Sequence, residues 1–249
     1  MIDDDMPQLP GLFVTGTDTD VGKTWITAAV AACLVREGYR PGVIKPVATG
    51  IADPMADTTD AAVLLRYAGW PVTPETIALA NPVHYRAPAA PTVAARAEGR
   101  VCRWDDVLEA VQESMRGWAE RGADVLLVEG AGGVCCPLAE GGKTMLDLIR
   151  ELDFPVLVVA RKGLGTLGHS IAAAKVLKHA PTRIAGAILN CVPGDDPSGL
   201  PERTAAAELA GYIAPVPVLH DGAPACDPAE IALAIERFGW YGRTARPRW

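Results

Sequence analysis

Residues 14–24 read VTGTDTDVGKT, and they are the part of the chain most informative about its fold. A phosphate-binding loop needs glycines whose backbone N–H groups can wrap a phosphate, a lysine that reaches the outer phosphates, and a Ser or Thr that binds magnesium. Gly22, Lys23 and Thr24 supply the second half of that pattern. Gly16 and Gly22 are separated by five residues, one more than the usual spacing. Because an apolar strand precedes the loop and a helical pattern follows it, we predict a variant phosphate-binding loop rather than a chance strand–helix turn.

Strand and helix patterns alternate along the rest of the chain. Short apolar runs predict strands at 12–16, 43–48, 124–130, 155–160, 184–190 and 216–219. Helical patterns occupy 23–38, 59–69, 104–122, 144–152, 169–180 and 228–239. Unbroken apolar strands between helices are typical of a parallel sheet that is covered on both faces. We therefore predict an α/β fold, a P-loop NTPase-like three-layer sandwich with a mostly parallel sheet, and an ordered Pro-rich loop at 70–92 that runs over the site.

Length and composition limit the classes of function. The 249 residues suit one large α/β domain, predicted at 11–240 between a short N-terminal tail, 1–10, and a loose C-terminal tail, 241–249. A formal net charge of −7 argues against binding to nucleic acid or an anionic membrane. The apolar runs are too short to span a bilayer, and MIDDDMPQLP does not resemble a secretory signal. We expect a cytoplasmic protein.

The six cysteines show no zinc-site spacing and no CxxC pair. We therefore expect reduced thiols, and we interpret the adjacent Cys135 and Cys136 as packing in a loop rather than as a redox pair.

Parallel sheets bind ligands beyond the carboxyl ends of their strands, which predicts sites at Gly16–Thr24, Lys45–Gly50, Glu129–Gly133, Arg161–His169 and Asn190. Glu129 ends an apolar strand and precedes GAGG, so its carboxylate could hold Mg²⁺. Lys45 lies inside the apolar VIKPVA and needs an anionic partner if it is buried. Asp60 lies in the first turn of a helix. The alternatives to ligand binding are that Glu129 is salt-bridged, that the Lys45 ammonium reaches solvent, and that Asp60 only interacts favourably with its helix dipole. The GGKT at 141–144 follows no strand and is predicted as a surface turn.

Four motifs in this order resemble the dethiobiotin synthase family. They are GTDTDVGKT at 16–24, KPVATG at 45–50, VEGAGG at 128–133 and LGTLGHS at 164–170. The resemblance runs from about residue 11 to 224, and the five-residue spacing of the first loop is a feature of that family. It implies an ATP-dependent cyclo-ligase of biotin biosynthesis. Such enzymes carboxylate 7,8-diaminopelargonate with CO₂, phosphorylate the carbamate with ATP and close the ureido ring, giving dethiobiotin, ADP and phosphate. The resemblance also implies Mg²⁺ and a homodimer with the substrate site near its interface.

The resemblance assigns roles residue by residue. Lys45 and Lys23 would be catalytic. The nucleotide-binding residues would be Asp20, Val21, Gly22, Lys23, Thr24, Trp25, Asp60, Glu129, Gly130, Ala131, Gly132, Asn190 and Pro224. The substrate would contact Thr19, Lys45, Thr49, Leu167 and Gly168, and Mg²⁺ would be held by Thr24, Asp60 and Glu129. Two positions depart from the family pattern: Gly168 replaces a frequent Asn, and Cys191 stands where an acidic residue can occur. His169 is interpreted as a structural residue at a helix start.

Three rival functions were weighed against this one. An amide-forming P-loop enzyme such as a cobyrinate diamide synthase usually carries a glutaminase domain, for which 249 residues leave no room. A partitioning-type ATPase carries a second lysine near the start of its loop, where this chain has Thr17, Asp18 and Thr19. A protein that binds nucleotide without catalysis would not need all of the charged residues named above.

Overall fold

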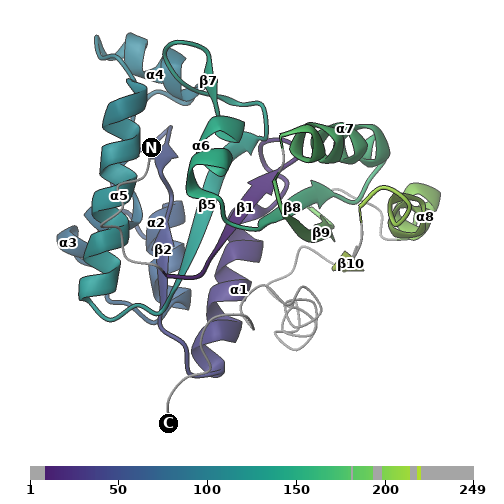
Figure 1. Ribbon diagram of the computed structural model, residues 1–249, viewed down its shortest axis with the longest axis horizontal. Helices are drawn as coiled ribbons and strands as arrows, with labels where there is room; N and C mark the ends of the chain where they lie inside the picture. Colours follow the sequence, from purple (N-terminus) through teal and green to yellow (C-terminus); the bar gives the residue numbers. More distant parts are fainter. Residues whose placement is uncertain (1–8, 181, 193–197, 214–217, 220–249) are drawn as a thin grey trace.

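The computed structural model describes residues 9–180, 182–192, 198–213 and 218–219, and its centre is a six-stranded parallel sheet (Figure 1). The strand order is β10-β9-β8-β1-β5-β2. These strands are β1 Gly11–Gly16, β2 Pro41–Ile44, β5 Val125–Gly133, β8 Val156–Arg161, β9 Ile184–Asn190 and β10 Val218–Leu219. Every pairing in this sheet is parallel, as the unbroken apolar runs predicted.

Helices cover both faces of the sheet. In Figure 1, α6 and α7 lie on one side of the strands and α1 lies on the other. The helices are α1 Lys23–Arg36, α2 Asp60–Tyr67, α3 Pro74–Ala80, α4 Pro91–Ala97, α5 Trp104–Glu120, α6 Met145–Leu152, α7 Thr166–His179 and α8 Leu200–Leu209. This arrangement confirms the predicted three-layer α/β fold.

The core lies where β1, β5 and β8 meet these helices. Phe13 on β1, Leu127 on β5 and Val158 on β8 have no exposed surface. Burying such side chains stabilises each of them by about 1.5–3 kcal/mol relative to exposure. A rigid sheet centre therefore supports the loops that follow β1 and β5.

The strand predicted at 43–48 is interrupted, so that prediction was wrong in part. β2 ends at Ile44, and Val47–Ala48 form a separate strand, β3, which pairs with β4 (Val83–His84) in a two-stranded sheet. Pro46 lies at the break and has no N–H to donate to a ladder. The chain therefore leaves the main sheet at Lys45.

The Pro-rich stretch 70–92 is more regular than the predicted loop. It contains α3, which begins with Pro74 after a capping box formed by Thr73 and Thr76. The stretch also contains β4 and the first residues of α4. The prolines of this stretch suggested a loop, but a proline in the first turn of a helix is compatible with helix formation.

Three further expectations concern other parts of the chain. The prediction that GGKT at 141–144 is a surface turn that follows no strand was wrong in part. β6 (Pro137–Ala139) precedes it, and only the two glycines lie in the turn, because Lys143–Thr144 form β7 and pair with β6 in a hairpin. In the part of the chain that the structure describes, no helix has the length and apolar character needed to cross a membrane. Pro224, the helix predicted at 228–239 and the tail at 241–249 lie outside the described residues.

Candidate active site

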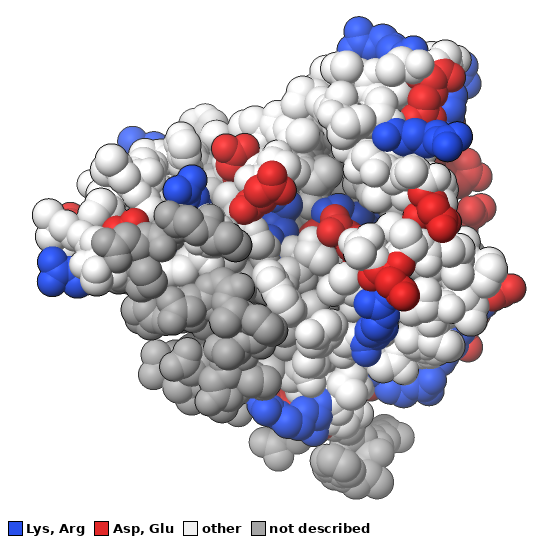
Figure 2. All heavy atoms as spheres, turned by 180° about the vertical axis from the view of Figure 1, so that it is seen from behind, with Lys and Arg blue, Asp and Glu red and all other residues white. Residues whose placement is uncertain are grey.

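A cavity of about 600 Å³ opens beside the phosphate-binding loop and the ends of β2 and β5. Its polar side carries residues from the loop, α1 and α2. Its apolar side comes from β3 and from the residues around Pro88. Figure 2 shows that acidic and basic side chains are mixed over one face of the molecule. The described part of that face has no broad basic stretch.

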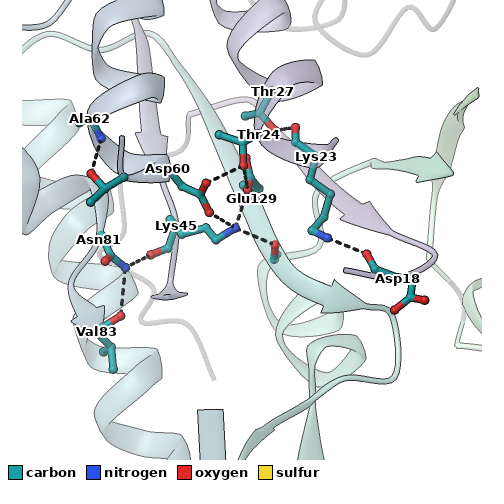
Figure 3. Close-up of polar contacts among 12 residues, drawn as sticks. Asp18, Lys23, Thr24, Thr27, Lys45, Asp60, Ala62, Asn81, Val83 and Glu129 are labelled. Atoms are coloured by element: carbon teal, nitrogen blue, oxygen red, sulfur yellow. Dashed lines mark hydrogen bonds and ion pairs between the residues drawn. The ribbon is translucent and has the colours of Figure 1, made fainter. Parts of the chain in front are cut away.

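Backbone geometry holds the phosphate-binding loop in place. Gly22 is the N-cap of α1 and has a left-handed φ of 89°. A Cβ atom at this position would lie 2.1 Å from Nδ2 of Asn190, so only glycine fits. The same Nδ2 donates a hydrogen bond of 3.1 Å to the carbonyl of Val21. Nζ of Lys23 donates to the carbonyl of Asp18 at 2.8 Å (Figure 3).

Side chains from α1, α2 and β5 and the lysine that follows β2 converge on one cluster (Figure 3). Glu129 lies within β5, which continues to Gly133, so the prediction that it ends its strand was wrong. Nζ of Lys45 lies 2.5 Å from Oε1 of Glu129 and 2.9 Å from Oδ2 of Asp60. The hydroxyl of Thr24 lies 2.9 Å from a carboxylate oxygen of Asp60 and 2.9 Å from Oε1 of Glu129. Lys45 is 5% exposed and Glu129 is fully buried. The ammonium of Lys45 therefore does not reach solvent, and Glu129 is salt-bridged to the lysine that was predicted to be catalytic.

The pKa values of the two lysines are shifted in opposite directions. Burial lowers the pKa of Lys45, but the carboxylates of Glu129 and Asp60 outweigh burial and raise that pKa above its ordinary value. Burial raises the pKa of Asp60, but the Lys45 ammonium outweighs burial and the net pKa is low. Burial and then the nearby charge of Lys45 lower the pKa of Lys23. Lys45 and Asp60 therefore form a charged pair at neutral pH, while Lys23 lacks an ionic partner of comparable strength.

The oxygen donors in this cluster suit Mg²⁺. Oε2 of Glu129 is buried and has no hydrogen-bond partner among the described residues. Thr24 and Asp60 add a hydroxyl and a carboxylate within hydrogen-bond distance of each other. Mg²⁺ is usually bound by one or two carboxylates together with substrate phosphates and waters. No group of three His, Cys, Asp or Glu side chains within the described ranges could hold a metal by itself, so phosphate oxygens would have to complete the shell.

Comparisons with known proteins agree with this geometry. A family model described as an AAA domain matches residues 10–222. The ATP-dependent dethiobiotin synthetase of Bacillus licheniformis is 35% identical over 87% of this chain and 89% of its own length. The enzyme of the same name from Rhodococcus jostii is 41% identical over 77% of each chain, and that of Anaeromyxobacter dehalogenans is 44% identical over 76% of this chain and 80% of its own.

The chain belongs to the ATP-dependent dethiobiotin synthetase family. Among solved structures, chloroplast FtsY from Physcomitrella patens is similar at 15% identity and a TM-score of 0.48, covering 94% of this chain and 67% of that one. That likeness is too weak to support an argument, so the assignment to the synthetase family rests on the sequence relatives and the family model.

Most of the residues expected from the synthetase family lie at the cavity. The predicted residues that line it are Thr19, Asp20, Gly22, Lys23, Thr24, Trp25, Lys45, Thr49, Asp60, Ala131 and Gly132. Glu129 and Gly130 are buried beneath it. Val21 and Asn190 are buried and joined by a hydrogen bond behind the loop. Leu167 and Gly168 are exposed on the first turns of α7 and do not line the cavity of their own chain. His169 is exposed in the same helix.

Sequence reasoning did not assign a role to the residues on the apolar side of the cavity. These residues are Val47, Ala48, Pro88, Ala89, Ala90 and Pro91. The first two lie inside the motif KPVATG, and the Pro-rich composition of 70–92 was the signal for the other four. Cys136 also lines the cavity, whereas Cys135 is exposed. Burial raises the pKa of the Cys136 thiol against the opposing charge of Lys23, which favours the unreactive thiol form.

Proposed function

We propose that this protein is an ATP-dependent dethiobiotin synthase, which acts on 7,8-diaminopelargonate, CO₂ and ATP. The observation that supports it best is the convergence of Lys23, Lys45 and the acidic pair Asp60 and Glu129 on one cavity. Phosphoryl transfer depends mainly on positioning the reactants and neutralising their charge. Two lysines beside a pair of carboxylates can do both, since the lysines bind anionic groups and the carboxylates bind a cation.

The reaction assigns separate tasks to the two lysines. Lys23, whose ammonium makes a hydrogen bond to a loop carbonyl, holds the outer phosphates of ATP. Lys45 faces the transferring phosphoryl group and the carbamate. The carbamate oxygen attacks the γ-phosphorus and the bond to ADP breaks, giving a carbamoyl phosphate. The second amine then attacks the carbamate carbon and expels phosphate, which closes the ring. Thr19 and Thr49 contact the diamine side of the same cavity.

We include Mg²⁺ in the proposal because the donors fit it. Thr24, Asp60 and Glu129 would hold it, and when bound it neutralises phosphate charge. Lys45 contacts two of these residues, so its ammonium has to move away from their oxygens toward the phosphoryl group. Asp20, Val21, Gly22, Trp25 and Gly130–Gly132 complete the proposed nucleotide site. Asn190 is assigned to the base in the family and also supports the loop through Val21.

We also propose a homodimer in which Leu167 and Gly168 reach the substrate in the partner's cavity. Both residues are exposed, and the nearby Leu164 is 88% exposed. Sedimentation equilibrium should give twice the chain mass. Mixing inactive Lys45→Ala with inactive Leu167→Arg should restore partial activity if the sites are shared, and no activity if each chain is self-sufficient.

The direct test is a reaction with Mg-ATP, bicarbonate and 7,8-diaminopelargonate, followed by mass spectrometry for dethiobiotin. Product that requires all three components is expected. Nucleotide hydrolysis that the diamine does not affect, without product, would instead indicate an ATPase switch. Lys45→Ala should nearly abolish product, measured at a temperature where this destabilised variant is still folded. Lys143→Ala in GGKT is the matched control and should keep normal activity, because Lys143 lies outside the cavity.

A further inference from the structure

The backbone of Lys45 is held by a helix end rather than by the main sheet. β2 ends at Ile44, and the next residue after Lys45 is a proline. The N–H of Lys45 instead donates to the carbonyl of Ala80, at the end of α3, over 2.6 Å. A buried peptide group that lacks such a partner costs about 1–3 kcal/mol. The contact with α3 therefore replaces the missing ladder bond on one side of Lys45.

Asn81 supplies the contact on the other side. Its Nδ2 donates to the carbonyl of Lys45 at 2.8 Å and to the carbonyl of Val83 at 3.0 Å (Figure 3). The side chain is 5% exposed, and its own backbone N–H bonds to the carbonyl of Ile77 at 2.8 Å. Two carbonyl acceptors fix the orientation of the amide, since only its NH₂ group can donate to them. Asn81 thus joins α3, β4 and the Lys45 peptide through hydrogen bonds.

We propose that Asn81 is a positioning residue for Lys45. The inference rests on the proposed role of Lys45 at the transferring phosphoryl group. Asn81 does not line the cavity, so it would act only through the Lys45 backbone. With its N–H and C=O both held, Lys45 can exchange its ammonium between the carboxylates and the phosphoryl group by side-chain rotation alone. Misplacing a reacting group by about 1 Å can cost on the order of 100-fold in rate.

The test compares a substitution of Asn81, the C-cap of α3, with a substitution of Thr76 inside this helix. Asn81→Asp keeps the shape and replaces the donor with an acceptor that faces two carbonyls. Thr76→Val is the matched control, because Thr76 is also 5% exposed and its hydroxyl bonds to the carbonyl of Pro71 at 2.6 Å, at the other end of the helix. Both variants lose a buried hydrogen bond near α3, but only Asn81→Asp frees the Lys45 peptide. Thermal melting, kcat and the KM for each substrate are measured on both, at a temperature where both are folded.

We expect Asn81→Asp to lower kcat by about 10- to 100-fold with the KM for ATP changed by less than about threefold. Thr76→Val should keep kcat within about twofold of wild type. Equal kcat values for the two variants, or a loss in Asn81→Asp that appears only in KM, would overturn the proposal. If Asn81→Asp does not fold, Asn81→Ala removes both side-chain donors, and an unchanged kcat in that variant would also contradict the positioning role of Asn81. Failure of the wild type to form dethiobiotin would refute the proposed function itself, and normal turnover in Lys45→Ala would remove Lys45 from the mechanism. Normal kcat in the Asn81 variants alone refutes only this inference.

Discussion

Replacing Lys45 by methionine should destabilise the protein strongly, even without substrates. The ammonium of Lys45 lies 2.5 Å from Oε1 of the fully buried Glu129, so its loss leaves an uncompensated buried carboxylate. Removing one partner of a buried pair costs about 3–5 kcal/mol. The side chain of Asp60 is 40% exposed, so its pairing with Lys45 adds less than about 1 kcal/mol after solvent screening. We therefore expect a loss of about 3–5 kcal/mol in the free energy of unfolding.

Urea unfolding of Lys45→Met, Glu129→Gln and the double variant measures this loss. The double variant removes both charges, so its free energy of unfolding should lie closer to wild type than that of Lys45→Met. A Lys45→Met loss below about 1 kcal/mol would show that the pair does not matter for stability. Losses that simply add in the double variant would show that Lys45 and Glu129 are not coupled, contrary to the geometry.

Three further predictions concern the loop, Lys23 and the metal. Gly22→Ala should lower the free energy of unfolding by at least the backbone strain of about 1–3 kcal/mol, and it should weaken ATP binding, measured by calorimetry. The matched control Gly141→Ala has a similar φ of 77° but open space around the added methyl, so it should incur only the backbone strain and leave ATP binding unchanged. Lys23→Met should raise the melting temperature without nucleotide, because burial and a neighbouring lysine lower the pKa of Lys23. Because the pKa of Lys23 is lower in the folded state than in the unfolded state, charged Lys23 destabilises the fold at neutral pH, and this destabilisation shrinks as pH rises toward about 10. An increase in melting temperature of Lys23→Met that grows with pH would contradict this prediction. Mg²⁺ should raise the melting temperature of the wild type and raise it much less in Asp60→Asn, and equal shifts would remove Asp60 from the proposed metal site.

The sequence predicted the fold because the decisive signals are local. Unbroken apolar strands, helical periodicity and the glycines of 16–24 each depend on neighbours within one element. The errors arose where a local pattern was overruled by tertiary contacts. The apolar run 43–48 looked continuous, yet the chain turns toward α3 at Pro46. The prolines of 70–92 suggested a loop, although one of them begins a helix.

The amino-acid sequence was enough to identify the chemical groups of the site: a variant phosphate-binding loop, two lysines and two carboxylates. The folded structure was needed to show that Lys45, Asp60 and Glu129 meet within hydrogen-bond distance, and that Asn81 donates a hydrogen bond to the peptide of Lys45. The physical reason is the strand order. Because β5 lies between β1 and β2, Glu129 is flanked by the loop after β1 and by Lys45 after β2, although Lys45 and Glu129 are 84 positions apart in the chain.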